Sequence, residues 1–472
     1  MDGQPLLLAG AWQLRDTTYE VRAPYDDTLL AHVSRGNAAD LEAATVAAVV
    51  AFAETRALPA HRRATILRAI ATGIAARGEE IAQTLAREAA KPITLARTEV
   101  QRSTFLFGYA AEEATRIHGE MLHLDAAPAG EGRQGIVRRF PLGPVAAITP
   151  FNFPLNLVAH KLAPAIAAGC PVVLKPASQT PLTAFKLAEI ILDAGWPGGA
   201  LSVLPLTNAD AAPLVEDERF KLLTFTGSPL VGWDMKQRAG RKRVALELGG
   251  NAGVIVHDDA DLAFAATRCV AGGFAYAGQT CISVQRIYVQ RQVYQPFLDL
   301  FLPKVRALTV GDPLDPATDL SALIRIDEAE RVAAWLAEAR AAGAEIVGGE
   351  IVGGVVQPTV VLGAGAELRV NCQEIFAPVV TVQPYDTFPE ALDLVNAGDF
   401  GLQAGVFTRD VARIFAAFAA LDVGGVIAND VPTWRVDHMP YGGVKHSGFG
   451  REGVRYAIEE MTEPRLLVIN LG

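Results

Sequence analysis

Beyond residue 136, short apolar strands alternate with helices of about 10–15 residues, and this alternation limits the possible folds more than any other feature. Strand Val172–Lys175 precedes helix Ala184–Asp193, and strand Gly253–Val256 precedes helix Leu262–Phe274. Two parallel strands need a helical crossover between them, so the pattern predicts an α/β fold with parallel sheets. Because the alternation continues well past the middle of the chain, we expect two large α/β domains and a small β element.

The first 120 residues follow a different pattern, in which short strands give way to helices. We expect strands at Leu6–Trp12 and Thr18–Val21, followed by the helices Leu41–Arg56, Ala60–Ala90 and Thr98–His118. Apolar residues near helical spacing support the second helix. Further strands are expected at 122–139 and 464–469, outside the two α/β domains.

Length and charge exclude several classes of protein. The 472 residues suffice for about three domain-sized units, and a net charge of −10 would repel a nucleic acid. The uncharged run 140–160 contains four prolines, which disfavour a membrane-spanning helix. No secretory signal is recognisable at the N-terminus.

The four cysteines are too few and too far apart for a disulfide framework, and no pair has the spacing of metal ligands. Lone thiols are typical of a reducing compartment, so we expect a cytoplasmic protein without a metal site.

Several segments carry residues suited to catalysis, each with a structural alternative. Asn152 lies between two prolines, where its amide can donate to an oxyanion or simply occupy a turn. Glu247 ends a strand beside two glycines and can act as a general base or form a salt bridge. Cys281 follows a tight turn and can be a nucleophile or an inert buried thiol.

Other segments are suited to binding a nucleotide. Lys175 ends a strand, and the turn with Gly227 and Ser228 can present backbone N–H groups to a pyrophosphate. Glu374 can bind a sugar diol, and the ring of Phe376 can pack on a heteroaromatic face. The structural alternatives are that Lys175 is solvated, that the turn is an ordinary one, and that Glu374 is a loop acid beside a core phenylalanine.

In combination these segments resemble the aldehyde dehydrogenase superfamily along nearly the whole chain. The matching stretches are PFNFP (150–154), KPAS (175–178), TGS (226–228), ELGGN (247–251), GQTC (278–281), EIFAP (374–378) and PYGGVKHSGFGRE (440–452). The CISVQR and WRVDHMPYGGVK stretches look most like the lactaldehyde and sulfolactaldehyde branch.

The resemblance implies NAD(P)-dependent oxidation of an aldehyde to a carboxylic acid. Cys281 would form a thiohemiacetal and then a thioester, Asn152 would hold the oxyanion, and Glu247 would activate the hydrolytic water. The coenzyme contacts implied are Thr149, Pro150, Lys175, Ser178, Gly227, Ser228, Leu248, Glu374 and Phe376. A CoA-acylating dehydrogenase and a non-catalytic member of the fold are the alternatives.

The resemblance also implies the domain organisation. We expect a Rossmann-type coenzyme-binding domain (1–121 and 141–249), an α/β catalytic domain (250–432), a β oligomerisation arm (122–140 and 457–472), and a substrate-access loop with its return segment (433–456). The arm would join copies of the chain into a homodimer or homotetramer, because unpaired strand edges need covering.

Three departures from the family pattern affect specificity. Ser178 stands where NAD-preferring members carry a glutamate that would repel a 2′-phosphate, so we expect NADP to be tolerated or preferred over NAD. Leu204–Thr207 replaces a glycine beside the adenine, and Thr280 stands where enzymes for phosphorylated substrates often carry arginine.

The substrate is expected to be a small polar aldehyde, either a 2-hydroxyaldehyde or a semialdehyde. Five cationic or titratable side chains are candidates to hold its tail: Arg102, His160, Arg286, Arg435 and His438. For each arginine, a surface or interdomain salt bridge is an equally good interpretation.

Overall fold

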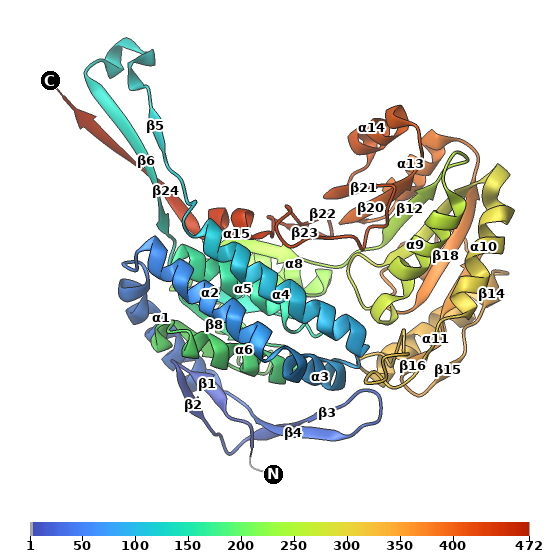
Figure 1. The fold of residues 1–472 in the computed structure, drawn as a ribbon, viewed down its shortest axis with the longest axis horizontal. Helices are drawn as coiled ribbons and strands as arrows, with labels where there is room; N and C mark the ends of the chain where they lie inside the picture. Colours follow the sequence, from blue (N-terminus) through green and yellow to red (C-terminus); the bar gives the residue numbers. More distant parts are fainter. Residues whose placement is uncertain (1–2, 472) are drawn as a thin grey trace.

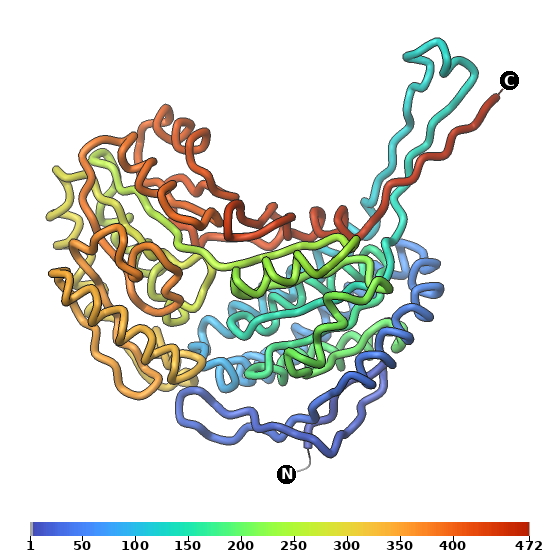
Figure 2. Tube along the Cα trace, turned by 180° about the vertical axis from the view of Figure 1, so that it is seen from behind, coloured from blue at the N-terminus to red at the C-terminus, as the bar shows by residue number. Residues whose placement is uncertain are grey.

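The computed structural model describes residues 3–471 and has two α/β lobes with a projecting arm. Figure 1 shows the two lobes side by side, and Figure 2 shows from behind that the C-terminal strand runs out along the arm. The predicted α/β class with two parallel sheets is confirmed.

The first lobe is built on an eight-stranded sheet whose five central strands are parallel. In spatial order its strands are β2 (Ala11–Gln13), β1 (Leu6–Leu8), β9 (Leu201–Val203), β8 (Val172–Lys175), β7 (Val145–Ile148), β10 (Leu222–Thr226), β11 (Arg243–Glu247) and β23 (Gly448–Phe449). The last strand comes from the segment predicted to form the substrate-access loop, so that segment is tied to this sheet.

Helices cover both faces of this sheet, as the continuous apolar strands require. Alternate residues of β7 enter different cores: Val145 and Ala147 pack with α2, α4, α5 and α6, whereas Ala146 and Ile148 pack with α1. The helices of this lobe are α1 (Ala38–Thr55), α2 (Ala60–Ala76), α3 (Gly78–Ala89), α4 (Ile93–Glu113), α5 (Asn156–Ala168), α6 (Pro181–Asp193), α7 (Ala212–Glu216) and α8 (Pro229–Arg238).

The predicted helix Ala60–Ala90 is in fact two helices. Arg77, with φ −100° and ψ 18°, leaves the helical backbone between α2 and α3, and the next residue is Gly78, a poor helix former. The helix predicted at Thr98–His118 begins five residues earlier, because Pro92 precedes the first turn of α4 and favours a helix start there.

The second lobe contains a seven-stranded sheet, parallel except for its first strand. Its spatial order is β14 (Glu345–Val347), β17 (Thr359–Leu362), β18 (Val379–Tyr385), β13 (Val284–Gln290), β12 (Ala252–Val256), β20 (Gln403–Phe407) and β21 (Gly425–Ala428). The covering helices are α9 (Leu262–Phe274), α10 (Tyr294–Arg306), α11 (Ile326–Ala341), α13 (Phe388–Asn396) and α14 (Val411–Ala420).

The arm is an antiparallel sheet of β5 (Glu120–Leu122), β6 (Arg133–Pro141) and β24 (Thr462–Asn470). Helix α15 (Val454–Glu460) precedes the last strand and packs on α5, so residues 457–460 of the predicted arm are helical. Small elements complete the chain: β3 (Thr18–Arg22) with β4 (Leu29–Ser34), β15 (Ile351–Val352) with β16 (Val355–Val356), β19 (Phe400–Gly401) with β22 (Val444–Lys445), and α12 (Arg369–Cys372).

Among residues 3–471, no helix combines the length and the hydropathy needed to cross a membrane. Within the same range, no cluster of three or more His, Cys, Asp or Glu side chains is arranged to hold a metal ion.

Candidate active site

A cavity of about 580 Å³ brings together the three predicted catalytic residues, Asn152, Glu247 and Cys281. Asn152 follows β7 and Glu247 ends β11, both in the first lobe, whereas Cys281 precedes β13 in the second. The cavity therefore takes catalytic side chains from both lobes. Asn152 and Glu247 lie at the carboxyl ends of parallel strands, where open α/β sheets bind ligands, whereas Cys281 lies before the amino end of β13.

Cys281 follows a strained turn at the end of α9. Tyr276 and Ala277 have φ values of 50° and 51°, a region that costs energy for residues other than glycine. A Cβ atom at Gly250 would lie 2.1 Å from the carbonyl oxygen of Cys281, so only glycine permits this approach of the two lobes.

The Sγ atom of Cys281 lies 3.0 Å from the hydroxyl oxygen of Tyr441. Burial raises the pKa of the Cys281 thiol to about 12, and the hydrogen bond that the Tyr441 hydroxyl can donate to the thiolate opposes that rise. The thiol is therefore held mainly in its protonated form, and its reaction requires a group that takes the proton.

Asn152 is fixed at both its backbone and its side chain. Its Nδ2 donates to the carbonyl of Gln279 at 3.0 Å, and its own carbonyl accepts from Nζ of Lys91 at 2.7 Å. Lys91 also pairs with Glu99. Only one of the two amide hydrogens of Asn152 is engaged in this way, and the other remains for an oxyanion.

Glu247 is a buried carboxyl whose pKa is raised well above its usual value, by burial first and then by the charge of Glu452. Its Oε2 atom has no hydrogen-bond partner among residues 3–471. Glu452 is ionised because Lys161 lies 3.3 Å away, and the pKa of Glu452 is lowered despite its burial. The two acids therefore divide their roles, with the proton on Glu247 and the charge on Glu452.

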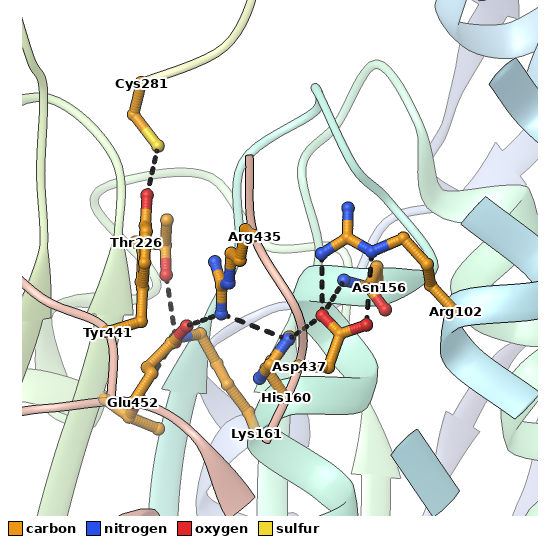
Figure 3. A network of polar contacts seen from close by, with 11 residues as sticks. Arg102, Asn156, His160, Lys161, Thr226, Cys281, Arg435, Asp437, Tyr441 and Glu452 are labelled. Atoms are coloured by element: carbon orange, nitrogen blue, oxygen red, sulfur yellow. Dashed lines mark hydrogen bonds and ion pairs between the residues drawn. The ribbon is translucent and has the colours of Figure 1, made fainter. Parts of the chain in front are cut away.

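Glu452 belongs to a buried polar network, and Figure 3 shows this network between Cys281 and Tyr441 at one end and Arg102 at the other. Arg435 stacks on the ring of Tyr441, with its guanidinium carbon 3.5 Å from the ring centroid. Its Nη2 contacts Glu452 at 3.5 Å and His160 at 3.1 Å, whereas its Nε has no partner among the described residues.

The far end of the network is centred on Asp437. This carboxylate receives hydrogen bonds from Arg102 at 2.6 Å and from Asn156 at 3.2 Å, and Nε2 of His160 lies 2.9 Å away. Although burial alone would raise the pKa of Asp437, the bonds from His160 and Arg102 hold it below its usual range. Burial lowers the pKa of His160, so its ring is neutral.

Of the predicted coenzyme contacts, six line the cavity: Pro150, Gly227, Ser228, Leu248, Glu374 and Phe376. Glu374 accepts a hydrogen bond from the N–H of Gly250 at 2.8 Å, and burial raises its pKa to about 7. Phe376 has φ 50° and meets Phe151 edge to face.

The other three predicted contacts, Thr149, Lys175 and Ser178, continue beyond the cavity along the edge of the first sheet. The hydroxyl of Thr149 is buried and has no partner among residues 3–471. Ser228 precedes α8 without capping it, which leaves N–H groups of the first turn available to an anion. These unsatisfied groups suit a dinucleotide lying along the edge of the sheet.

Two of the predicted substrate residues do not lie at the cavity. Arg286 points into the second lobe, where it donates to the carbonyls of Asn251 at 2.9 Å and Leu394 at 3.0 Å. Its position in a buried strand turns it away from the access funnel that we expected. His438 is exposed and packs against the rings of Phe105 and Tyr109, on the outer side of α4.

The remaining three behave differently. Arg102 and Arg435 line the cavity. His160 is buried behind them and reaches the cavity only through its contact with Arg435. We expected His160 to contact the substrate, but in the structure Arg435 lies between His160 and the cavity.

Sequence reasoning assigned no role to four residues of this network: Lys161, Asp437, Tyr441 and Glu452. One signal was available, because His160 and Lys161 are the only titratable residues in α5, which is buried along its whole length. Buried charges need partners, so their presence in this helix indicates a polar network nearby.

Comparisons with known proteins agree with the geometry. The model of the aldehyde dehydrogenase family matches residues 12–467. A 3-sulfolactaldehyde dehydrogenase of Priestia aryabhattai is 44% identical over 468 residues, which cover 99% of this chain and 98% of that protein.

Solved structures give the same result. Aldehyde dehydrogenase 21 from Physcomitrella patens, in complex with the reaction product succinate, superposes with a TM-score of 0.98 at 44% identity, covering 99% of this chain and 98% of that one. NADP-dependent glyceraldehyde-3-phosphate dehydrogenase from Bacillus halodurans C-125, complexed with NADP, has a TM-score of 0.97 at 34% identity, covering 100% of both chains. The chain belongs to the aldehyde dehydrogenase family and is an oxidoreductase that acts on aldehydes with a nicotinamide coenzyme.

Proposed function

We propose that this protein oxidises a small aldehyde with an anionic tail to the carboxylic acid, through a thioester on Cys281 and with NADP accepted at least as readily as NAD. The observation that carries the proposal is the uncompensated positive charge that the buried network presents to a cavity containing Cys281 and Glu247.

The first step follows from the surroundings of Cys281. Its thiol gives up a proton, and the sulfur attacks the aldehyde carbon to form a thiohemiacetal whose oxyanion accepts from Asn152. The thiol proton passes to the solvent, so Glu247 remains available as the base of the second step. A bound oxidised nicotinamide would supply the acceptor for the hydride of the thiohemiacetal, and a thioester would remain on Cys281.

The second step is hydrolysis, in which Glu247 acts as general base. A water molecule that transfers its proton to Glu247 attacks the thioester carbonyl, which releases the acid and returns the proton to the sulfur. Glu452 stays ionised beside Lys161, so it disfavours ionisation of Glu247 and keeps that side chain basic enough for the task.

The charge of the network favours an anionic tail on the substrate. Arg102, Lys161 and Arg435 carry three positive charges. Two ionised carboxylates, Asp437 and Glu452, compensate two of them. Since His160 is neutral, one positive charge remains in a network whose Arg102 and Arg435 line the cavity, and Nε of Arg435 has no partner among residues 3–471. A semialdehyde carboxylate or a sulfonate supplies the missing negative charge.

The coenzyme is assigned to the wall formed by the first sheet and α8. Ser228 and the first turn of α8 suit the pyrophosphate, and Glu374 suits the nicotinamide ribose. Ser178 carries no charge that would repel a 2′-phosphate, and this supports the use of NADP.

We assign coenzyme binding to residues 1–121 and 141–249, catalysis to 250–432, substrate access to 433–456, and assembly to the arm of 122–140 and 457–472. The arm supports a homo-oligomer because β24 leaves one edge unpaired and exposes apolar residues on both faces, with Leu466 54% and Leu467 56% exposed. The four free thiols suit the cytoplasm.

Steady-state kinetics tests the proposal with matched substrates. Succinic semialdehyde and butanal share a four-carbon chain, and we expect kcat/KM to be at least about tenfold higher for the anion. Reduced coenzyme should form with NADP and without added CoA. Equal values for the two aldehydes, or a requirement for CoA, would overturn the assignment. Light scattering at micromolar concentration tests the homo-oligomer.

A further inference from the structure

Lys175 is a buried cation without a partner. The residue is 9% exposed at the carboxyl end of β8, and its side chain forms no ion pair or hydrogen bond with any residue in 3–471. Burial of an unpaired ammonium group is costly, which indicates that a ligand supplies the missing anion. Burial lowers the pKa of Lys175, and the positive charge of Arg35 lowers it further.

Arg35 approaches the same sheet edge from a distant part of the sequence. It follows β4, and the N–H of the next residue, Gly36, donates to the carbonyl of Pro205 at 2.9 Å. Pro205 lies just beyond β9, where the N–H of Leu204 donates to Leu174 of β8, the residue before Lys175. The N-terminal segment thus delivers Arg35 beside the end of β8.

The guanidinium group of Arg35 is also free of acidic partners. It lies 4.6 Å from the ring centroid of Tyr19, which fixes the side chain, and no carboxylate among residues 3–471 pairs with it. Asp40, on the adjoining helix α1, is already paired with Arg15. Two cations therefore face one sheet edge with no protein anion between them.

We propose that Arg35 is a specificity-determining residue that binds the 2′-phosphate of NADP together with Lys175. This inference rests on the proposed function, because it takes the edge beside Ser178 as the adenosine site. A 2′-phosphate carries up to two negative charges and several acceptor oxygens, which match one guanidinium and one ammonium group. With NAD, the two cations would have a ribose hydroxyl in place of an anion.

Binding of coenzyme fragments tests the contact without turnover. Adenosine 2′,5′-bisphosphate and AMP differ only in the 2′-phosphate, and titration calorimetry with each ligand gives a ratio of dissociation constants. We expect the wild-type protein to bind the bisphosphate at least about tenfold more tightly than AMP.

Arg35→Gln should reduce that ratio about tenfold while the dissociation constant for AMP stays within about twofold, and Arg35→Lys should retain part of it. Arg241→Gln, at an arginine whose side chain is 94% exposed, is the matched control and should leave the ratio unchanged. Thermal melting checks that each variant is folded.

The outcomes separate this inference from the proposed function. An unchanged ratio in a folded Arg35→Gln variant overturns the role of Arg35, even if aldehydes are oxidised with NADP. A ratio near one in the wild-type protein overturns both the role of Arg35 and the NADP assignment. A ratio that depends on Arg35 supports the contact even if no tested aldehyde is oxidised.

Discussion

The sulfur of Cys281 lies 3.0 Å from the hydroxyl of Tyr441, and the same tyrosine ring supports the guanidinium group of Arg435 at 3.5 Å. One aromatic residue therefore connects the nucleophile to the cationic network that faces the substrate. Tyr441 is a positioning residue for both, since its ring stacks on the guanidinium group of Arg435 and its hydroxyl shares a hydrogen bond with the sulfur.

Replacing Tyr441 by phenylalanine should slow the reaction of Cys281 with iodoacetamide about tenfold at pH 8. Loss of one hydrogen bond to the thiolate raises the pKa of the thiol by roughly one unit, and only the thiolate reacts. The measurement is the pH profile of the labelling rate, which should shift upwards in the variant. Tyr25→Phe, at a residue that is 40% exposed, is the control. A profile identical to that of the wild-type protein would contradict this role.

Arg286→Ala should destabilise the fold and leave substrate preference unchanged. The side chain is 4% exposed and donates to the carbonyls of Asn251, Leu394 and Val395, which would all lose a partner. We expect the free energy of unfolding to fall by about 2–4 kcal/mol, measured by urea denaturation. A specific rise in KM for anionic aldehydes, with stability unchanged, would return Arg286 to the substrate site.

The different outcomes for Arg286 and Arg435 show what the sequence could and could not predict. Motifs indicated Cys281, Glu247 and Asn152, because each lies in a short segment whose geometry is local. The residues next to an arginine in the sequence do not show in which direction its side chain points. Arg286 lies in a strand, where a shift of one residue reverses the face, and only the structure shows that it faces α13.

The rate of thioester hydrolysis should rise with pH. Burial raises the pKa of Glu247, so the protonated form predominates at low pH and cannot accept a proton from water. Ionisation as the pH increases through that raised pKa produces the active base. Single-turnover measurements of acid release between pH 6 and 9 should show this increase, and Glu247→Gln should be slow at every pH. A wild-type rate that falls over this range would contradict the assignment of the base.

Helices and strands were predicted well where the spacing of apolar residues and the residues that begin or end an element indicated the same boundaries. Helix α9 begins and ends where its sequence predicts, since Asp261 caps it and its side chain accepts from the N–H of Phe264. The interruption at Arg77 was missed because apolar residues continue at helical spacing across it. The pairing of β23 with β11 joins residues about 200 positions apart, and no local signal encodes such a contact.

The most direct test of the account is peptide mass spectrometry on the Glu247→Gln variant, quenched after mixing with aldehyde and NADP. The account predicts one equivalent of reduced coenzyme per active site and an acyl group on the peptide that contains Cys281, with neither formed in Cys281→Ala. Reduced coenzyme in the Cys281→Ala variant, or an acyl group on another residue, would contradict it.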